Sequence, residues 1–326
     1  MERKTVHQSS GFTHQVVIPV YIPAQEGYFR DSFKNFRLCL RSLCETSHSK
    51  TYFTIVNNGS HQEVKDFLDK LLSDGEIHEL IHTENIGKAN AVIKGLLGHK
   101  TELVTIADAD VLFLSGWQRE TAKIYRAFPK AGVVGIVPQY KMFTYKCTNI
   151  LIDYMLSKKL RFIQIVNPDA MKSFYKSVGR EDANPDWSKL GLALVTNEGT
   201  ALVGAGHFVA TYKRDIFNDV VTFFKFKLGG NSLDYIDGLC LKKDYWRLTT
   251  IDNFAYHMGN THEEWMDAIH FEAQTELEYG FPVSKSINKL SWYIKNDLFY
   301  KIFKSRRVRR WYYKIKKLPP EMIFKY

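Results

Sequence analysis

The chain has 326 residues, of which 45% are hydrophobic and 14% aromatic, a composition that indicates a folded globular protein and excludes a disordered chain. Its length accommodates about two ordinary domains or one large α/β domain with attachments. The formal net charge is +10, but residues 301–326 contain ten Lys or Arg against one acidic residue, Glu321, so the preceding 300 residues are nearly neutral. The sequence therefore predicts a basic C-terminal extension on a nearly neutral protein.

Targeting signals and paired cysteines are absent from the sequence. The start, MERKTVHQSSGFTHQ, has no apolar core of a secretory signal, and no window reaches the ~20 apolar residues of a membrane-spanning helix. Four cysteines follow no CxxC spacing, which argues against a zinc site and against a disulfide framework. We therefore expect a cytoplasmic protein that is soluble or peripheral on the inner face of the cell membrane.

A strand followed by a helix recurs along the first third of the chain. Apolar, β-rich runs predict strands at 15–20, 51–60, 77–83 and 102–110. Apolar residues spaced three and four apart predict helices between these strands. This alternation predicts a parallel sheet with right-handed crossovers, in which ligands bind beyond the carboxyl ends of the strands.

The alternation ends after about residue 140. We expect 140–190 to be an insertion of helices and loops, and 190–212 to contain a hairpin. A short helix is predicted within 232–246 and strand character within 247–260. From about residue 287 onward the chain is predicted to be helical, aromatic and basic.

Two carboxylates close the fourth predicted strand, in the run TIADADVLFL. Asp108 and Asp110 flank one alanine, so in an extended chain their side chains point to the same side. A buried carboxylate is costly unless a cation or hydrogen-bond donors satisfy it. Paired oxygen ligands suit Mg²⁺ or Mn²⁺ that also holds substrate phosphates. A solvated turn is the alternative, but the position at a strand end favours a metal site.

Four runs appear in an order more specific than any one of them: VVIPVY, IVNNGS, ENIGKANAVIKGL and ADAD. Together they resemble the nucleotide-binding half of an inverting family 2 glycosyltransferase with the GT-A fold. The resemblance continues through VGAGHFVATYKRDIF and DYIDGLCLKK to YHMGN. It covers roughly residues 14–260 and implies an α/β fold with a doubly wound, mostly parallel sheet; the helical C-terminal extension lies outside it.

The resemblance also implies a domain organisation. The GT-A domain would span 1–260, with a nucleotide-binding half at about 14–138 and an acceptor-binding half at about 139–260. A helical, basic extension would occupy 261–326.

Nucleotide contacts follow from the resemblance position by position. Pro19 and Tyr21 match the end of the first strand, which cradles the base. Asn57 and Asn58 stand where the family usually has an aspartate, and because an amide also offers donors, the base stays open. Lys88 matches the cation that faces the diphosphate, at a helix N-terminus that also favours an anion.

Metal and catalytic residues are implied in the same way. Asp108 resembles the carboxylate near the ribose and the metal, Asp110 the direct metal ligand, and His257 the histidine that completes the metal shell. Inverting transfer also requires a base for the acceptor hydroxyl. Asp237 falls on this base in DYIDGLCLKK, and Asp234, one helical turn earlier, is the competitor, with helix capping as its other role.

The function implied is inverting transfer of a sugar from a nucleotide-diphosphate sugar to a hydroxyl of a glycan or lipid-linked glycan, with Mn²⁺ or Mg²⁺ as cofactor. A nucleotidyltransferase of similar fold would need a Gly-rich phosphate loop after the first strand, and VYIPAQEGYFRDS contains none. A sugar-nucleotide-binding protein without turnover stays open.

The basic extension interleaves cations with aromatic residues in SRRVRRWYYKIKK. This mixture suits an anionic membrane surface, in which Trp311, Tyr312, Tyr313 and Ile315 would take part. It also fits nucleic acid or a solvated tail. A membrane is favoured over nucleic acid because lipid-linked acceptors reside there, so we predict that 301–326 contact an anionic membrane surface.

Overall fold

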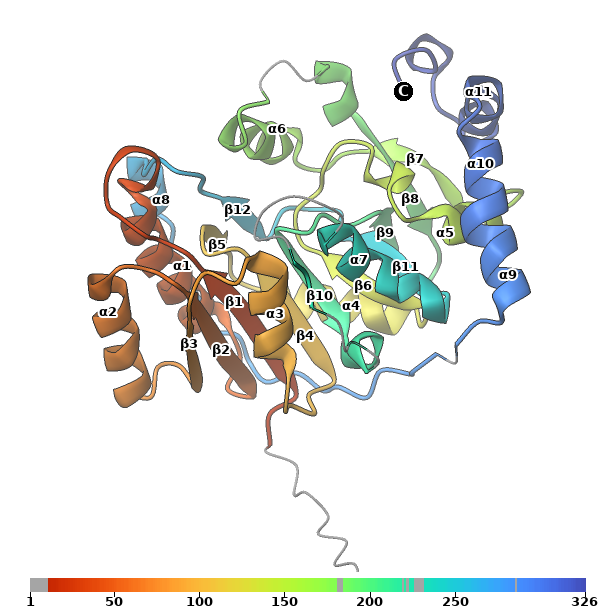
Figure 1. Cartoon of the computed structure of the whole chain (residues 1–326). Coiled ribbons are helices and arrows are strands. Elements are labelled where there is room, and N and C mark those ends of the chain that lie inside the picture. The colour runs from red at the N-terminus through yellow and green to blue at the C-terminus, as the bar shows by residue number, and fades with distance from the viewer. Residues whose placement is uncertain (1–10, 181–183, 219, 221–222, 226–231, 285) are drawn as a thin grey trace, which may run out of the picture.

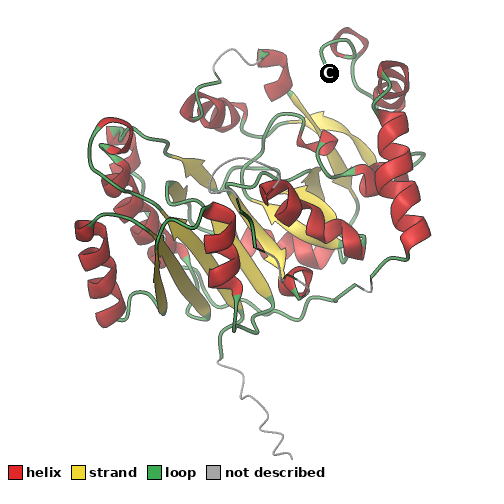
Figure 2. Ribbon diagram, in the orientation of Figure 1, coloured by secondary structure: helices red, strands yellow, loops and turns green. Residues whose placement is uncertain are grey.

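The computed structural model describes residues 11–180, 184–218, 220, 223–225, 232–284 and 286–326. Its centre is a ten-stranded sheet with helices on both faces (Figure 2). The strands follow the order β3-β2-β1-β4-β10-β6-β11-β9-β8-β7, and β12 and β5 form a separate two-stranded sheet. Among the described residues, no helix is both long enough and apolar enough to cross a membrane.

Four parallel strands form the half of the sheet that the sequence predicted (Figure 1): β1 (His14–Val20), β2 (Thr51–Asn58), β3 (Glu79–Thr83) and β4 (Leu103–Ala107). The helices between them are α1 (Ser32–Thr46), α2 (Gln62–Ser73) and α3 (Lys88–Leu96). Every residue of β1 is buried, as expected for a strand covered on both faces. Val16 and Ile18 pack in one cluster with α1 and α2, and Val17 packs with α3 on the other face. The doubly wound arrangement is thereby confirmed.

The second half of the sheet is mixed. Its strands are β6 (Ala131–Gly135), β7 (Leu160–Gln164), β8 (Leu190–Val195), β9 (Thr200–Val203), β10 (Val209–Lys213) and β11 (Trp246–Thr249). β10 runs antiparallel between β4 and β6, and β11 runs parallel to β6. Following the pairings across the sheet, β1 to β4, β6, β8 and β11 run in one direction, and β7, β9 and β10 in the other. The sheet is therefore mostly parallel in strand direction, as predicted.

Two predictions for the later chain need refinement. The segment 140–190 contains α5 (Thr148–Asp153) and α6 (Pro168–Ser177), as expected, but also β7, whose short alternation was missed. β8 and β9 form the predicted hairpin, whereas β10 leaves it and joins the parallel strands. The remaining elements are α4 (Trp117–Ala127), α7 (Ser232–Gly238), α8 (Glu264–Asp267), β5 (Val111–Phe113) and β12 (Ala255–His257).

The C-terminal extension packs against the rest of the molecule. After α8 the chain runs beneath the sheet to reach three helices at the far side (Figure 1): α9 (Lys289–Tyr293), α10 (Phe299–Phe303) and α11 (Arg306–Ile315). A π-helical turn, Ile294–Leu298, joins α9 to α10. Tyr312 and Tyr313 are buried in a cluster that also contains residues of β7 and β8. The boundary at residue 260 stays a prediction, although residues on both sides of it share the same apolar clusters.

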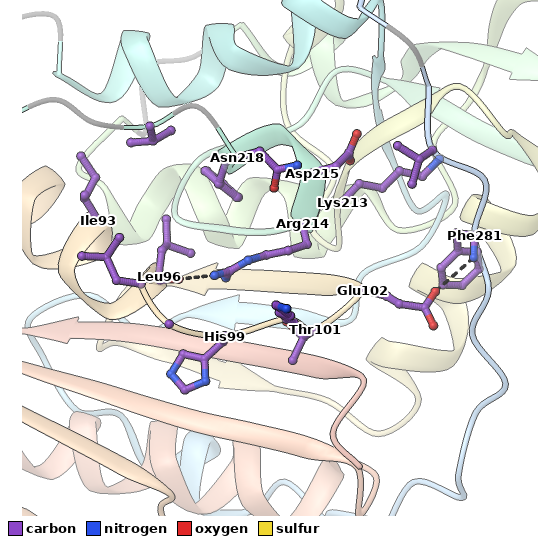
Figure 3. A pocket seen from close by; sticks show the side chains of 16 residues that line it. Ile93, Leu96, His99, Thr101, Glu102, Lys213, Arg214, Asp215, Asn218 and Phe281 are labelled. Carbon is purple, nitrogen blue, oxygen red and sulfur yellow. Dashed lines mark hydrogen bonds between the residues drawn. The ribbon is translucent and has the colours of Figure 1, made fainter. Parts of the chain in front are cut away.

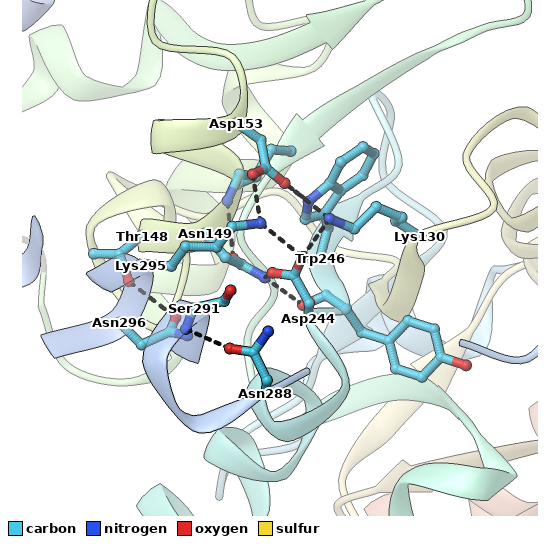
Figure 4. A network of polar contacts seen from close by, with 12 residues as sticks. Lys130, Thr148, Asn149, Asp153, Asp244, Trp246, Asn288, Ser291, Lys295 and Asn296 are labelled. Atoms are coloured by element: carbon cyan, nitrogen blue, oxygen red, sulfur yellow. Dashed lines mark hydrogen bonds and ion pairs between the residues drawn. The ribbon is translucent and has the colours of Figure 1, made fainter. Parts of the chain in front are cut away.

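Two lysines and two aspartates anchor this helical segment (Figure 4). Lys295, in the π turn, lies 2.7 Å from both Asp153 and Asp244, and Lys130 lies 2.9 and 2.6 Å from the same two carboxylates. Burial alone would raise the pKa of Asp153, but hydrogen bonds from Lys295 and Lys130 outweigh it and lower the pKa. Through Lys295, the network connects the extension to Asp153 of α5 and to Asp244 just before β11, and its two positive charges balance its two negative charges.

A second polar network joins the extension to β1. His14 and His48 both contact the hydroxyl of Tyr279, at 3.3 and 2.6 Å. Burial lowers the pKa of His48 to about 4 and holds that of His14 well below 6.5. Both rings are therefore neutral in the folded protein at pH 7.

Acidification is expected to destabilise the protein through this pair. The unfolded chain takes up protons near pH 6.5, whereas folded His48 does so only near 4, so stability present above pH 6.5 is lost as the pH falls towards 4. Thermal unfolding across this range should show a falling melting temperature, with a smaller fall for His48→Gln. The exposed His270→Gln is the matched control. An unchanged slope in His48→Gln would contradict the assignment.

Candidate active site

The end of β4 and the small sheet of β5 and β12 place Asp110 beside His257. β5 follows Asp110 directly and pairs with β12 so that Val111 lies opposite His257. Met258 also donates its backbone N–H to the carbonyl oxygen of Asp110, at 2.8 Å. As a result, Nε2 of His257 lies 3.3 Å from Oδ2 of Asp110. Residues 147 positions apart in the chain thus meet at one edge.

The hydrogen bonds of Ser177 determine which nitrogen of His257 carries the proton. The Ser177 hydroxyl donates to the carbonyl oxygen of Phe174 at 2.7 Å, and its oxygen lies 2.9 Å from Nδ1 of His257. Because its single proton is already used, the hydroxyl accepts from Nδ1–H, and Nε2 carries a lone pair towards Asp110. In the neutral ring, this lone pair and the carboxylate oxygen repel each other unless a proton or a metal ion lies between them.

Asp110 itself has the character of a cation ligand. Its Oδ1 is buried and has no hydrogen-bond partner among the described residues. Burial is the largest influence on this carboxyl and raises its pKa. A buried carboxylate oxygen beside an imidazole lone pair, with the other ring nitrogen held by a hydroxyl, fits a divalent ion such as Mn²⁺.

Asp108 pairs with a lysine. Its carboxylate forms an ion pair with Lys88, the first residue of α3. The backbone N–H of Asp108 donates to the carbonyl oxygen of Phe208 at 2.7 Å, which ties the end of β4 to β10. Within the described ranges, no three His, Cys, Asp or Glu side chains lie close enough to hold a metal ion. A metal role for Asp108 stays a prediction.

A cavity of about 310 Å³ opens at this edge of the sheet. Six of the residues predicted from the sequence line it: Pro19, Tyr21, Asn58, Lys88, Asp108 and Asp110. The sequence analysis missed Tyr28, Phe29, Asn85 and Asn260, which also line the cavity. Asn260 closes the quoted run YHMGN, and Asn85 opens NIGK, so nearness to both motifs was the available signal.

The two asparagines after β2 have different surroundings. Asn57 is buried and does not line the cavity: its amide lies 2.9 Å from Nδ1 of His82, and its oxygen accepts from the Ser60 N–H at 3.0 Å. Asn58 lines the cavity, but its oxygen accepts the Ile86 N–H at 2.9 Å and so holds the loop before α3. Only its amide group is left to meet a ligand.

The turn at Gly59 brings this loop close. Gly59 has φ +90°, and a Cβ there would lie 2.8 Å from the backbone nitrogen of Asn85. Glycine is required on both grounds. The Asn58-Gly59 pair therefore positions the loop that leads into α3, whose first residue is Lys88.

Asp237 is enclosed by its neighbours. Its side chain is 1% exposed, and the Arg247 guanidinium, which is fully buried, lies 3.0 Å from Oδ1. The hydroxyls of Tyr145 and Tyr212 donate to it at 3.2 and 3.4 Å. Arg247 also donates to the carbonyl oxygen of Asp237 at 3.1 Å. Such a carboxylate is satisfied in place by a buried cation and two donors.

Asp234 lies one helical turn earlier in α7 and is exposed. The Tyr145 hydroxyl contacts both carboxylates, Asp234 more closely than Asp237, and its single proton is donated to one of them at a time. Burial raises the pKa of Tyr145 far above its usual value, so the hydroxyl stays protonated and remains a donor.

The helix that carries both aspartates is connected to Asp108 and His257 through the two residues before β10. His207 places Nδ1 3.8 Å from Asp237 Oδ2, and the next residue, Phe208, accepts from Asp108. The Phe208 ring also packs against His257, with centroids 5.3 Å apart. Asp108, His257 and α7 therefore surround the same end of the strands.

A larger cavity, about 460 Å³, lies at the opposite ends of these strands (Figure 3). Its two cations already have partners within the protein: Arg214 donates to Gln15 at 2.9 Å, and Lys213 donates to the carbonyl oxygens of Pro129 and Pro282, both at 2.7 Å. One oxygen each of Thr101 and Asp215 is buried there without a partner among the described residues. Ligands of parallel sheets bind at the carboxyl ends of the strands. The smaller cavity is therefore the candidate active site.

Several solved structures resemble the chain at low identity. Staphylococcus aureus TarS 1–349 has 12% identity and a TM-score of 0.43, over 75% of this chain and 60% of that one. GalNAc-T7 with UDP, GalNAc and Mn²⁺ has 12% identity and a TM-score of 0.46, over 75% and 43%. The mannosyltransferase PcManGT from Pyrobaculum calidifontis, in complex with GDP-Man and Mn²⁺, has 13% and 0.43, over 93% and 72%.

The chain thus spans about three fifths of the TarS fragment. No curated protein matches the sequence significantly.

The family comparison is more direct. Residues 16–187, more than half of the chain, match the family model of glycosyl transferase family 2. This range contains most of β1, all of β2 to β4, and the residues Lys88, Asp108 and Asp110 that line the cavity. The chain, whose fold is α/β, belongs to glycosyl transferase family 2.

Proposed function

We propose that this enzyme transfers a sugar, with inversion, from a nucleotide-diphosphate sugar to a hydroxyl of a glycan or lipid-linked glycan, with the help of a divalent ion. The observation that carries the proposal is the pairing of Asp110 and His257 beside the cavity that Lys88 lines. Asp110 and His257 would hold Mn²⁺ or Mg²⁺, and Asp108 would join them by leaving Lys88. When bound, the ion neutralises the diphosphate leaving group.

The remaining residues of the cavity would hold the donor. Lys88 and the N-terminus of α3 supply positive charge for the diphosphate. Tyr21 and Asn58 would contact the base, Asn58 through its amide N–H groups, because its oxygen is already occupied. Pro19 lines the cavity, and Asn57, which does not line it, would stabilise the turn after β2 by accepting the Ser60 N–H.

For the base we propose Asp234 in place of Asp237, which the sequence favoured. A base must reach the acceptor hydroxyl and be free to take its proton. Asp234 is exposed, and its side chain is hydrogen-bonded to Tyr145 and to no other described residue, whereas Asp237 would have to leave buried Arg247. Asp237 would then act as the residue that positions α7 through Arg247.

A cytoplasmic location is part of the proposal. All four cysteines are unpaired, and Cys39, Cys147 and Cys240 are buried. Unpaired cysteines are typical of a reducing compartment.

A panel of nucleotide sugars tests the function. One nucleotide diphosphate sugar should raise the melting temperature in Mn²⁺ but not in EDTA, and should be hydrolysed slowly without an acceptor. Binding without hydrolysis or transfer would support a sugar-nucleotide-binding protein. Release of pyrophosphate from a nucleoside triphosphate and a sugar 1-phosphate would support a nucleotidyltransferase and contradict the proposal.

A further inference from the structure

Large apolar side chains recur along the outer side of the C-terminal helices. We call Leu290, Ile294, Leu298 and Ile302 the apolar row: they are 69, 41, 41 and 47% exposed. They are spaced four apart along one continuous helix, 289–303. Each step of four rotates an α-helical row by about 40°, and the wider π turn in the middle reduces this drift. Trp292, Tyr293 and Tyr300 of the same helix are also exposed.

The other side of this helix is fixed to the protein. Phe299 and Phe303 are buried, and Lys295 is held by Asp153 and Asp244 in the network of Figure 4. Thr148 donates to Asn296 from the same side, at 3.3 Å. The helix therefore presents the apolar row outward as a fixed surface. Single exposed apolar residues are common, but a contiguous group marks a site of interaction.

α11 carries exposed cations and a second exposed apolar group. Arg307, Trp311, Lys314 and Ile315 are all exposed, at spacings that place them on one face of α11. Tyr312 and Tyr313 are buried, so the sequence-based expectation that these two tyrosines meet a membrane is wrong. The apolar contact lies on 290–302 and on Trp311 and Ile315.

A cationic pocket adjoins α11. Arg306, Arg309 and Arg310 line a cavity of about 340 Å³ together with Lys325. None of the three arginines forms an ion pair with an acidic residue in the described part of the chain. Arg310 packs its guanidinium 4.5 Å from the Phe324 ring, which holds it in place. Neighbouring guanidinium groups repel each other, and a phosphate among them would relieve this through paired hydrogen bonds.

We propose that the apolar row, the exposed face of α11 and the cationic pocket form one docking surface for an anionic lipid bilayer. The apolar side chains would enter the headgroup region, with the aromatic rings at its boundary, and the arginines would bind a lipid phosphate. Charge complementarity selects this occupant, because residues 301–326 carry ten cations and one acidic residue. A nucleic acid would use the cations but leave the apolar row in water.

Vesicle co-sedimentation of the full chain tests the two halves of the surface separately. The protein should bind phosphatidylcholine vesicles that contain phosphatidylglycerol, and not phosphatidylcholine alone. The triple variant Arg306→Gln, Arg309→Gln, Arg310→Gln should bind about a hundredfold more weakly, since three cations near an anionic surface are removed. The variant with all four residues of the apolar row changed to Ser should lose the binding that survives high salt.

Matched controls test whether the location of the substituted residues matters, or only the loss of charge or of apolar side chains. Lys70→Gln, Lys94→Gln, Lys100→Gln removes the same charge from exposed positions elsewhere, and Leu97→Ser, Leu156→Ser removes exposed leucines elsewhere. Both controls should bind like the parent. Circular dichroism should give the parent spectrum and melting temperature for every variant.

Three outcomes would overturn the proposal. They are equal binding by the arginine variant and its lysine control, unchanged salt-resistant binding by the apolar-row variant, and saturable binding of glycerol phosphate or of an oligonucleotide without binding to vesicles. Asp110→Asn should bind vesicles like the parent, so failure of the glycosyl-transfer proposal and failure of the membrane proposal are distinguishable.

Discussion

The Asp110→Asn variant is expected to bind its nucleotide sugar at least about a hundredfold more weakly in Mn²⁺, to the level seen in EDTA. Asparagine keeps the shape of the side chain but lacks the charge that would hold the ion beside the Nε2 lone pair of His257. Binding is measured by titration of the nucleotide with and without Mn²⁺.

Stability provides a second measurement for the same variant. Without metal, the free energy of unfolding should stay the same or rise, because the change removes a buried charge whose Oδ1 has no partner in the described structure. Asp74→Asn, an exposed residue after α2, is the control. Unchanged Mn²⁺ dependence in a folded Asp110→Asn protein would refute the metal assignment.

The largest effect on turnover is expected for Asp234→Asn. Loss of a general base lowers the rate of transfer by about 10² to 10⁴, and because Asp234 is exposed, folding and donor binding should be unaffected. Glycosyl transfer beside a nucleotide titration measures both.

Asp237→Asn should behave differently. It leaves the fully buried guanidinium of Arg247 without its counter-charge, at a cost of about 3 to 5 kcal/mol in the free energy of unfolding. Combining Asp237→Leu with Arg247→Met should recover much of this stability, because both charges are then removed together.

The two variants can also decide against the assignment. A stable Asp237→Asn protein with lost transfer, beside an active Asp234→Asn, would return the base to Asp237. If both variants transfer at the parent rate, neither aspartate of α7 is the general base and this assignment is refuted.

The parts of the fold that the sequence predicted depend on local periodicity. In β1 to β4 and the helices between them, short apolar runs alternate with stretches of 3.6-residue period, and each unit could be recognised alone. β10 could not be placed this way, because its insertion between β4 and β6 depends on pairing with strands more than 70 residues away. The pairing of β5 with β12, which brings His257 to Asp110, is non-local for the same reason.

For the site, the sequence predicted which short segments take part but not which residue of each segment reaches the cavity. Asn57 and Asn58 are neighbours in a strand, so their side chains point to opposite faces and only one could line the cavity. Asp234 and Asp237 share a helix face, and spacing alone cannot separate them. Arg247, on β11, separates them by pairing with Asp237, and that contact is formed only in three dimensions.

The contact between Tyr279 and His14 has a consequence for how the chain folds. It joins residues 265 positions apart, at the first strand of the nucleotide-binding half. During synthesis, β1 therefore lacks part of its environment until the ribosome has made most of the chain. Long-range contacts of this kind slow folding and prolong the exposure of apolar strands. The nucleotide-binding half is thus expected to complete its folding late, together with the extension, and to depend on chaperones until Tyr279 is in place.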